Sequence, residues 1–267
     1  MSRIGERFRL LRARGEKALI PFVTAGDPDL ATTEALLPAL ALAGADVIEL
    51  GVPFSDPMAE GPTIQRASER ALRSGASLRK VLQLVERVRP KVDVPIVLMG
   101  YANNFLAMGE EEFAAAAAEV GVDGLIAVDL PPEEGEGLHG ALRARGVDPI
   151  LLAAPTTRPE RLEMLAKRTA GFLYFVSLTG TTGARQTLSE TLEREVRAVR
   201  AISNVPVCVG FGVSTPEHAA RIAAFADGVV VGSAVVDRIE RAASPDAAVE
   251  AVVAFVEDLK RPLRRAD

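Results

Sequence analysis

The sequence has a single cysteine, Cys208, and only two histidines, His139 and His218. One cysteine cannot form a disulfide within the chain, and because Cys208 lies in the apolar run 205–209 we interpret it as a small core residue. With so few Cys and His residues there is no cluster with metal-site spacing, so we expect no bound metal. Both histidines fall in predicted helices, and we interpret them as solvated surface residues.

Long apolar runs and an excess of positive charge are also missing. No stretch reaches the roughly 18 apolar residues of a membrane span, and the charged residues 1–15 lack the apolar centre of a signal peptide. The net charge is −5, with 31 Lys and Arg against 36 Asp and Glu. A nucleic-acid or anionic-membrane surface would need clustered basic residues. These absences predict a cytoplasmic protein whose ligands are small molecules.

What the sequence does have is a repeated unit of one apolar strand followed by helix. The 267 residues contain no linker, so we expect one domain spanning residues 1–267. Helical crossovers require parallel pairing, and eight such units predict an α/β fold of the closed (β/α)8 TIM-barrel type. An open doubly wound sheet is the alternative, but residues 26–28 lack its G-x-G-x-x-G turn. The predicted strands are 19–25, 46–52, 95–101, 124–130, 149–154, 172–177, 206–211 and 228–231.

Helical periodicity fills the segments between these strands. An extra helix at residues 1–14 precedes the first strand, where it would close the bottom of the barrel. A short helix is expected from Ser233, directly after the eighth strand. The other predicted helices are 31–43, 63–73, 78–89, 111–120, 133–145, 158–168, 189–202, 216–225 and 245–260.

One strand carries a carboxylate, Glu49, where a buried strand ordinarily has another apolar residue. TIM barrels build their active sites at the carboxyl ends of the strands, and Glu49 lies near such an end. Burial among apolar neighbours would raise the pKa of this carboxyl towards a value useful for proton transfer. The proline-rich loop that follows holds two more acids, Asp56 and Glu60, for which solvated loop charges are the alternative interpretation. Asp129 has a similar place in the fourth strand, and for it a catalytic and a merely hydrogen-bonding role remain equally open.

Glycines stand where a barrel of this type binds phosphate. Residues 210–212 (GFG) follow the seventh strand, and Gly232 and Ser233 follow the eighth at the start of the short helix. Glycines let backbone N–H groups approach an anion, and a helix start adds unpaired donors. The loop 179–185 after the sixth strand is long enough for a lid. The alternative interpretation is that these glycines only form turns and bind no phosphate.

Six segments combine into a highly specific pattern: PFVTAGDP (21–28), ELGVPFSDPMAEGPTIQ (49–65), YAN (101–103), TGTTG (179–183), GFGVS (210–214) and GSA (232–234). On these segments the chain resembles the α subunit of tryptophan synthase across essentially its whole length. The resemblance implies a lyase of tryptophan biosynthesis that cleaves indole-3-glycerol phosphate to indole and glyceraldehyde 3-phosphate. It also implies an α2β2 complex with a β subunit, in which pyridoxal phosphate belongs to the β subunit and this subunit has no cofactor.

The resemblance assigns roles position by position. Glu49 matches the catalytic glutamate that protonates C3 of indole and takes the proton of the neighbouring hydroxyl. Glu60 stands where the family usually has an aspartate that receives the indole N–H, and its extra methylene is a departure. Residues matching the substrate pocket are Phe22, Met99, Tyr101, Leu125, Leu152, Tyr174 and Phe211, with Asp129 and Thr182 as further candidates. Residues matching the phosphate site are Gly183, Gly212, Gly232 and Ser233.

Other functions stay open at this point. The chain could act alone as an indole-releasing lyase, be a catalytically weak barrel that mainly activates a β subunit, or act on another phosphorylated substrate as an isomerase or aldolase. A Schiff-base aldolase would want a lysine at a strand end, whereas Lys91 and Lys167 lie near helix ends. The stiff loop 53–58 beside the catalytic strand suits partner docking, which makes Asp56 and Pro57 interface candidates.

Overall fold

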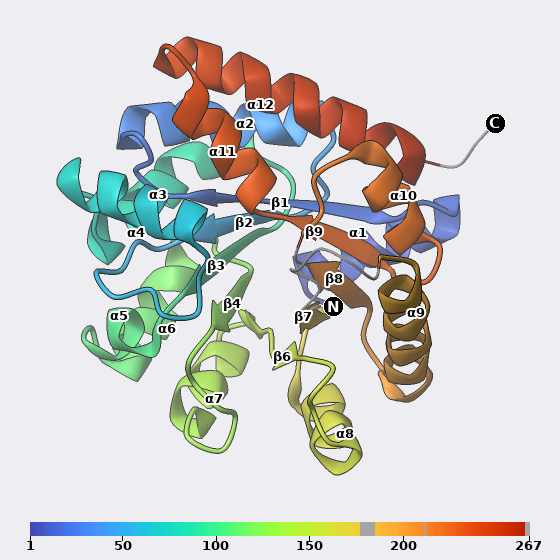
Figure 1. Cartoon of the computed structure of the whole chain (residues 1–267). Coiled ribbons are helices and arrows are strands. Elements are labelled where there is room, and N and C mark those ends of the chain that lie inside the picture. Colours follow the sequence, from blue (N-terminus) through green and yellow to red (C-terminus); the bar gives the residue numbers. More distant parts are fainter. Residues whose placement is uncertain (177–184, 211, 265–267) are drawn as a thin grey trace.

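The computed structural model describes residues 1–176, 185–210 and 212–264, which form a barrel of parallel strands surrounded by helices (Figure 1). All nine strands assigned in these residues belong to one sheet, with the order β5-β4-β3-β2-β1-β9-β8-β7-β6. The strands are β1 Ala18–Thr24, β2 Ile48–Gly51, β3 Ile96–Gly100, β4 Gly124–Ala127, β5 Asp148–Pro149, β6 Leu152–Ala153, β7 Leu173–Val176, β8 Val207–Gly210 and β9 Gly228–Val231.

The two strands at the ends of this order close the barrel, because they are consecutive pieces of one extended stretch. β5 pairs with β4, and β6 pairs with β7. Between these pieces, the Ile150 N–H donates to the Leu125 carbonyl oxygen at 2.9 Å, and the Tyr174 N–H donates to that of Leu151 at 3.0 Å. The predicted (β/α)8 barrel is therefore confirmed, with its fifth strand divided in two.

Helices follow the strands as the periodicity predicts, with ends that move by a few residues. They are α1 Arg3–Arg14, α2 Leu30–Ala43, α3 Pro62–Arg73, α4 Leu78–Val88, α5 Ala102–Leu106, α6 Glu110–Glu119, α7 Glu136–Ala144, α8 Pro159–Arg168, α9 Arg185–Ile202, α10 Pro216–Ala223, α11 Ser233–Arg241 and α12 Pro245–Lys260, with 3-10 turns at Arg89–Lys91 and Arg261–Leu263. The short helix α5 is an addition to the predicted set. Within the described ranges, no helix has the length and apolarity to cross a membrane.

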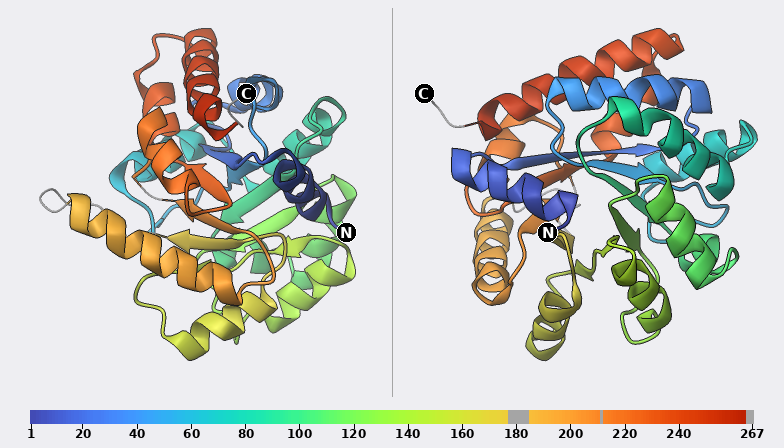
Figure 2. Two further views of the ribbon diagram at one scale, coloured as in Figure 1. Left: turned by 90° about the vertical axis from the view of Figure 1, so that its right-hand side faces the viewer. Right: turned by 180° about the vertical axis from the view of Figure 1, so that it is seen from behind.

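Helix α1 lies across the end of the barrel opposite the carboxyl ends of the strands (Figure 2). Its residues Ile4, Phe8 and Leu11 pack against strand residues that point into the barrel, among them Ile20 and Cys208. This plug shields the interior from water at that end, as predicted. Cys208 is fully buried in the same cluster, which confirms its interpretation as a core residue.

The start of strand β2 is fixed by an ion pair just before it. The Nζ atom of Lys260, on helix α12, lies 2.8 Å from the Oδ2 atom of Asp46. The same carboxylate oxygen accepts a hydrogen bond from the Leu19 backbone N–H of β1 at 2.8 Å. Both charged side chains are almost entirely buried. The pair therefore joins α12, β1 and β2 three residues before Glu49.

The interpretation of His139 as a solvated residue is wrong. His139 lies on the inner face of α7 with Leu138 and Leu142, and only 5% of its surface is exposed. Burial, with smaller contributions from the charges of Arg143 and Arg168, lowers its pKa to about 4, so the imidazole is neutral at pH 7. Leu138, His139 and Leu142 share the buried face of this helix, and the sequence alone did not show that the imidazole belongs to that face.

Candidate active site

Residues predicted to carry function lie at the mouth formed by the carboxyl ends of the strands. Glu49 is the second residue of β2, and the register places it beside Phe22 of β1 and Val97 of β3. Because all strands are parallel, the residues that follow them meet at this same end. Those predicted residues are Tyr101 after β3, Asp129 after β4, Gly212 after β8, and Gly232 and Ser233 after β9.

Glu49 is a carboxylic acid held in an apolar interior. Its exposed fraction is 0%, and neither of its carboxyl oxygens has a hydrogen-bond partner among the described residues. Burial, with a smaller contribution from the charge of Glu60, raises the pKa of Glu49 to about 8. The side chain is therefore mainly protonated at pH 7 and can donate a proton to a bound molecule.

Glu60 is a second carboxyl group close to the first. It is half-buried in the loop between β2 and α3, and burial raises its pKa to about 7. Its backbone oxygen accepts a hydrogen bond from the Gln65 side-chain amide at 2.9 Å, which fixes the loop to the first turn of α3. Glu60 lines a small cavity with Phe22, Thr24, Gly51, Val52, Pro57, Ile64, Ser68, Met99, Gly100 and Tyr101.

Tyr101 holds the loop that carries Glu60. Its hydroxyl oxygen accepts a hydrogen bond from the Ala59 N–H at 2.8 Å, and its ring stacks on Phe54 with 4.9 Å between centroids. Burial raises the pKa of Tyr101 to about 12, so the phenol stays neutral. The residue thus serves both as a wall of the cavity and as the anchor of the loop.

The structure gives Asp129 a hydrogen-bonding role. Its side chain is exposed, and its Oδ1 atom accepts a hydrogen bond from the Ala102 N–H at 2.7 Å. That donor is the first N–H of α5, directly after Tyr101, so the carboxylate fixes the start of this helix. The hydrogen bond that was one of the two roles left open for Asp129 is therefore present, and a role towards the substrate stays a prediction.

Apolar side chains line the barrel interior below the mouth. Met99, Leu152 and Tyr174 lie in one interior cluster, as predicted. Leu125 does not belong to it, because it packs on the outer side of the sheet against a cluster that includes Leu138 and Leu142. The next residue along the strand, Ile126, lies in the interior position that was predicted for Leu125.

Ile126 points into the barrel and pairs in register with Met99. Successive residues of a strand face opposite sides, so the prediction was displaced by one residue. A strand buried on both faces is apolar throughout and does not reveal its own parity. The strand register, which pairs Ile126 with Met99, shows that Ile126 is the residue that faces the interior.

Helix α11 begins at the mouth and presents its N-terminus there. Its first residue is Ser233, and its first internal hydrogen bonds run from the N–H groups of Val235 and Val236 to the Gly232 oxygen. The preceding N–H groups at a helix start are the donors that bind anions. Gly212 has a φ of 74°, a conformation that favours glycine. Three further predicted residues, Thr182, Gly183 and Phe211, lie outside the described residues.

A chain of ion pairs joins the helix that follows Glu60 to the helix that begins at Ser233. On α3, Arg70 binds the buried Asp27 carboxylate with distances of 2.7 and 2.9 Å, and it also contacts Glu240 of α11 at 2.7 Å. Arg66 binds the same Glu240 through two hydrogen bonds of 2.7 Å. The two helices and the loop after β1 are thereby held in one arrangement around the cavity.

Residues 55–58 form the exposed tip of the loop before Glu60. Asp56 is exposed and accepts a 2.6 Å hydrogen bond from the Ser55 hydroxyl, and Pro57 is half-buried. Met58 is 88% exposed. The exposed tip adjoins the cavity directly, because Pro57 is one of the residues that line it.

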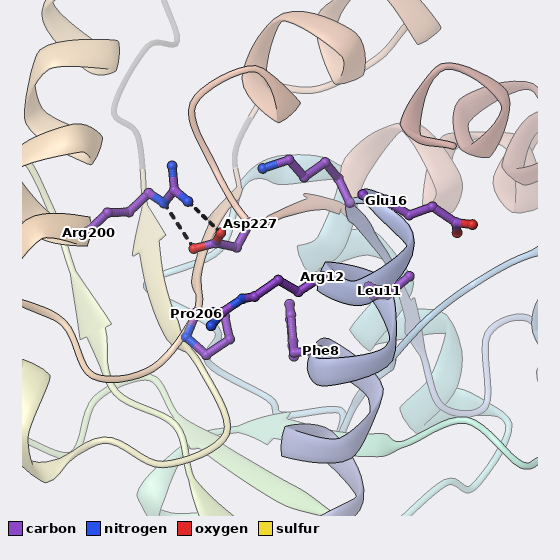
Figure 3. A pocket seen from close by; sticks show the side chains of 9 residues that line it. Phe8, Leu11, Arg12, Glu16, Arg200, Pro206 and Asp227 are labelled. Carbon is purple, nitrogen blue, oxygen red and sulfur yellow. Dashed lines mark hydrogen bonds and ion pairs between the residues drawn. The ribbon is translucent and has the colours of Figure 1, made fainter. Parts of the chain in front are cut away.

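A larger hollow at the opposite end of the barrel holds none of the predicted residues (Figure 3). It lies between α1 and the Arg200–Asp227 ion pair, whose closest atoms are 2.8 Å apart. Phe8, Leu11 and Pro206 form its apolar floor. Throughout the described ranges, no group of three or more His, Cys, Asp or Glu residues could hold a metal ion.

Comparison with known proteins gives one family. The family model described as "Tryptophan synthase alpha chain" matches residues 8–264. A tryptophan synthase alpha chain of Geobacter sp. (strain M21) is 54% identical over 261 residues, covering 98% of this chain and 97% of the relative.

Solved structures agree with this match. Tryptophan synthase subunit alpha from Legionella pneumophila str. Paris is 41% identical, with a TM-score of 0.91 and 98% of each chain covered. A chain of tryptophan synthase from M. tuberculosis, in the aminoacrylate- and BRD0059-bound form, is 37% identical, with a TM-score of 0.89 and 99% of each chain covered.

The burial of Glu49 predicts a pH-dependent difference in stability between the parent protein and Glu49→Gln. In the folded state the carboxyl has a pKa of about 8 instead of 4.5, so between these values the folded protein holds a proton that the unfolded chain has lost. The free energy of unfolding of the parent therefore falls, relative to Glu49→Gln, as the pH rises from about 4.5 to 8. Each pKa unit is worth about 1.4 kcal/mol. Urea denaturation at several pH values measures this, and a difference that does not change with pH would contradict it.

Proposed function

The chain belongs to the tryptophan synthase alpha chain family, and on that premise we propose how its residues carry out the reaction of this subunit. It is a lyase that cleaves indole-3-glycerol phosphate to indole and glyceraldehyde 3-phosphate in tryptophan biosynthesis. The observation that carries the proposal is the buried carboxyl of Glu49, without a hydrogen-bond partner in the described residues and protonated at pH 7, with Glu60 beside it. A different isomerase or aldolase activity is not favoured.

Glu49 is the proton donor and acceptor of this mechanism. Its proton goes to C3 of the indole ring, which turns the ring into an iminium ion that can accept electrons. The resulting carboxylate then takes the proton of the side-chain hydroxyl next to C3. As the aldehyde forms, the bond between C3 and the side chain breaks and its electrons return to the ring. One acid whose pKa lies near neutrality serves both steps.

Glu60 binds the indole N–H. A pKa of about 7 leaves a substantial part of this carboxyl ionised at neutral pH, so it can accept the hydrogen bond. Its negative charge also stabilises the positive charge that the ring acquires on protonation, and an interaction that strengthens in this way accelerates the reaction.

The remaining contacts orient the substrate. The apolar side chains of Phe22, Met99, Ile126, Leu152 and Tyr174 are suited to the flat indole ring. The phosphate is proposed to bind at the neighbouring end of β9, where Gly232 lies next to Phe22 and Ile64 of the cavity. There the start of α11 supplies N–H donors, and the residues assigned to the phosphate are Gly212, Gly232 and Ser233, with Gly183 from the loop outside the described residues. Thr182 of that loop stays a candidate for the substrate pocket.

The chain is one subunit of an assembly with a tryptophan synthase β subunit. We propose that the loop tip with Asp56, Pro57 and the exposed Met58 contacts this partner, because it is the exposed part of the segment that also carries Glu60. Pyridoxal phosphate is proposed to belong to the β subunit alone, so that this subunit works without a cofactor. We place the assembly in the cytoplasm, which suits a chain whose one cysteine is buried and reduced.

Replacement of Glu49 by Gln tests the proposed function directly. The amide keeps the shape of the side chain but transfers no proton, so release of indole from indole-3-glycerol phosphate should fall by about 10² to 10⁴-fold with substrate binding largely retained. The assay compares both proteins with and without the β subunit. Activity of the variant within a few fold of the parent would remove Glu49 from the mechanism, and an inactive parent would contradict the function itself.

A series at position 60 tests the second carboxyl. Glu60→Gln should reduce indole release strongly because the amide cannot carry the negative charge. Glu60→Asp should keep or raise the rate, since it restores the shorter side chain that is usual in the family. Glu60→Ala should be the slowest of the three. If the Gln and Ala variants both turn over like the parent, Glu60 does not bind the indole N–H.

Asp56→Ala tests the partner surface. If the loop tip contacts the β subunit, the variant should lose more of the activation by this subunit than of its own basal rate, because docking and the placement of Glu60 share one loop. Indole release measured over a range of β-subunit concentrations separates the two effects. An equal loss in both assays would show that the loop serves the chemistry directly.

A further inference from the structure

The Thr24 hydroxyl is buried without a hydrogen-bond partner among the described residues. Thr24 is the last residue of β1, only 1% of its surface is exposed, and its Oγ1 atom has no partner there. A buried hydroxyl that makes no hydrogen bond destabilises the folded state. We therefore expect the Thr24 hydroxyl to gain a hydrogen-bond partner when the substrate is bound.

Other buried threonines of this chain are satisfied by the fold. The Thr33 hydroxyl donates to the Asp29 carbonyl oxygen at 3.1 Å and accepts from the Gly26 N–H at 3.0 Å. The Thr169 hydroxyl donates to the Phe172 carbonyl oxygen at 2.8 Å. In the described part of the chain, the only buried side-chain atoms without a partner are Thr24 Oγ1, both carboxyl oxygens of Glu49 and Arg7 Nε. Three of these four atoms face the reaction site.

The direction of the Thr24 side chain follows from the alternation along β1. Phe22 and Thr24 are two residues apart and therefore point to the same, inner side of the sheet. The register pairs Phe22 with Glu49 and Thr24 with Gly51, so Thr24 lies one layer above Glu49, nearer the mouth. At that level it lines the same cavity as Glu60.

In its own layer of the barrel interior, the Thr24 hydroxyl has one suitable acceptor, the carboxylate of Glu60. Glu49 lies in the layer below, and the Tyr101 hydroxyl, which accepts the Ala59 N–H, is uncharged and a weaker acceptor than a carboxylate. The Ser68 hydroxyl from α3 lines the cavity too, but it is uncharged and therefore a weaker hydrogen-bond acceptor than an ionised carboxylate. The Glu60 carboxylate has only acceptor oxygens when it is ionised, and Thr24 supplies the donor.

We propose that Thr24 is a positioning residue for Glu60, donating a hydrogen bond from its hydroxyl to the Glu60 carboxylate when the substrate is bound. This inference rests on the proposed function of Glu60. The bond fixes one carboxylate oxygen and turns the other towards the indole N–H. A glutamate needs this more than an aspartate would, because its longer side chain has one more rotatable bond to restrain.

Thr24→Val and Thr24→Ser test the proposal in the complex with the β subunit. Valine keeps the shape and removes the hydroxyl, so kcat for indole release should fall by about 10- to 100-fold, the loss expected from a misplaced catalytic group, with a much smaller change in KM. The melting temperature of Thr24→Val should equal or exceed that of the parent, because an unsatisfied hydroxyl is removed. Thr24→Ser restores the donor and should return kcat to within a few fold of the parent.

Thr33→Val is the matched control. It removes a hydroxyl that already has partners in the fold, so its melting temperature should fall while kcat stays near that of the parent. Parental kcat in Thr24→Val would overturn the inference. So would a melting temperature that falls together with kcat, or a serine variant as slow as the valine variant. An inactive parent would overturn the proposed function and this inference with it, whereas an active parent matched by Thr24→Val overturns the inference alone.

Discussion

Burial of one carboxyl group without a hydrogen-bond partner in the described residues is the constraint on which the site depends. The fold has to hold Glu49 in an apolar interior although isolated ionisable groups avoid such places. It meets the cost by keeping the group protonated, which is the chemical state that the reaction requires. The strand that carries Glu49 is in turn fixed at its other end by the buried Asp46–Lys260 ion pair. A buried pair of this kind determines position more than it adds stability.

The two carboxyls of the site differ because their surroundings differ. Glu49 belongs to a strand that is paired on both sides, so its place is set by the rigid part of the barrel. Glu60 belongs to a loop held by single hydrogen bonds from Ala59 and Gln65. Helix α3, which follows this loop, is tied through Arg66 and Arg70 to the helix that begins at Ser233. The ends of the site that we propose for phosphate and for indole are therefore parts of one connected arrangement of helices.

The sequence was sufficient for the barrel, because eight apolar segments with helices between them leave few other ways to pair the strands. It was also sufficient to single out Glu49 as a buried carboxyl within a barrel strand, since an acid inside an apolar strand has no ordinary structural reason. It was not sufficient for the choice between Leu125 and Ile126, because a strand apolar on both faces looks the same in either parity. His139 and Thr24 were missed for a related reason. Whether a single polar side chain faces the interior depends on neighbours from other strands and helices.

Glu60 has one more methylene than the aspartate usual in the family, so its side chain has to adjust if the carboxylate is to reach the same position. The Tyr101 hydroxyl holds the N–H of the preceding residue, and Gln65 holds the carbonyl oxygen of Glu60 itself, so the backbone is fixed on both sides of the side chain. A longer side chain on a fixed backbone can reach the position of a shorter one only by folding through its own torsions. The carboxylate then has several orientations of similar energy, and a neighbouring donor is needed to select one. In this barrel the end of β1 provides a hydroxyl at the level where that selection has to be made.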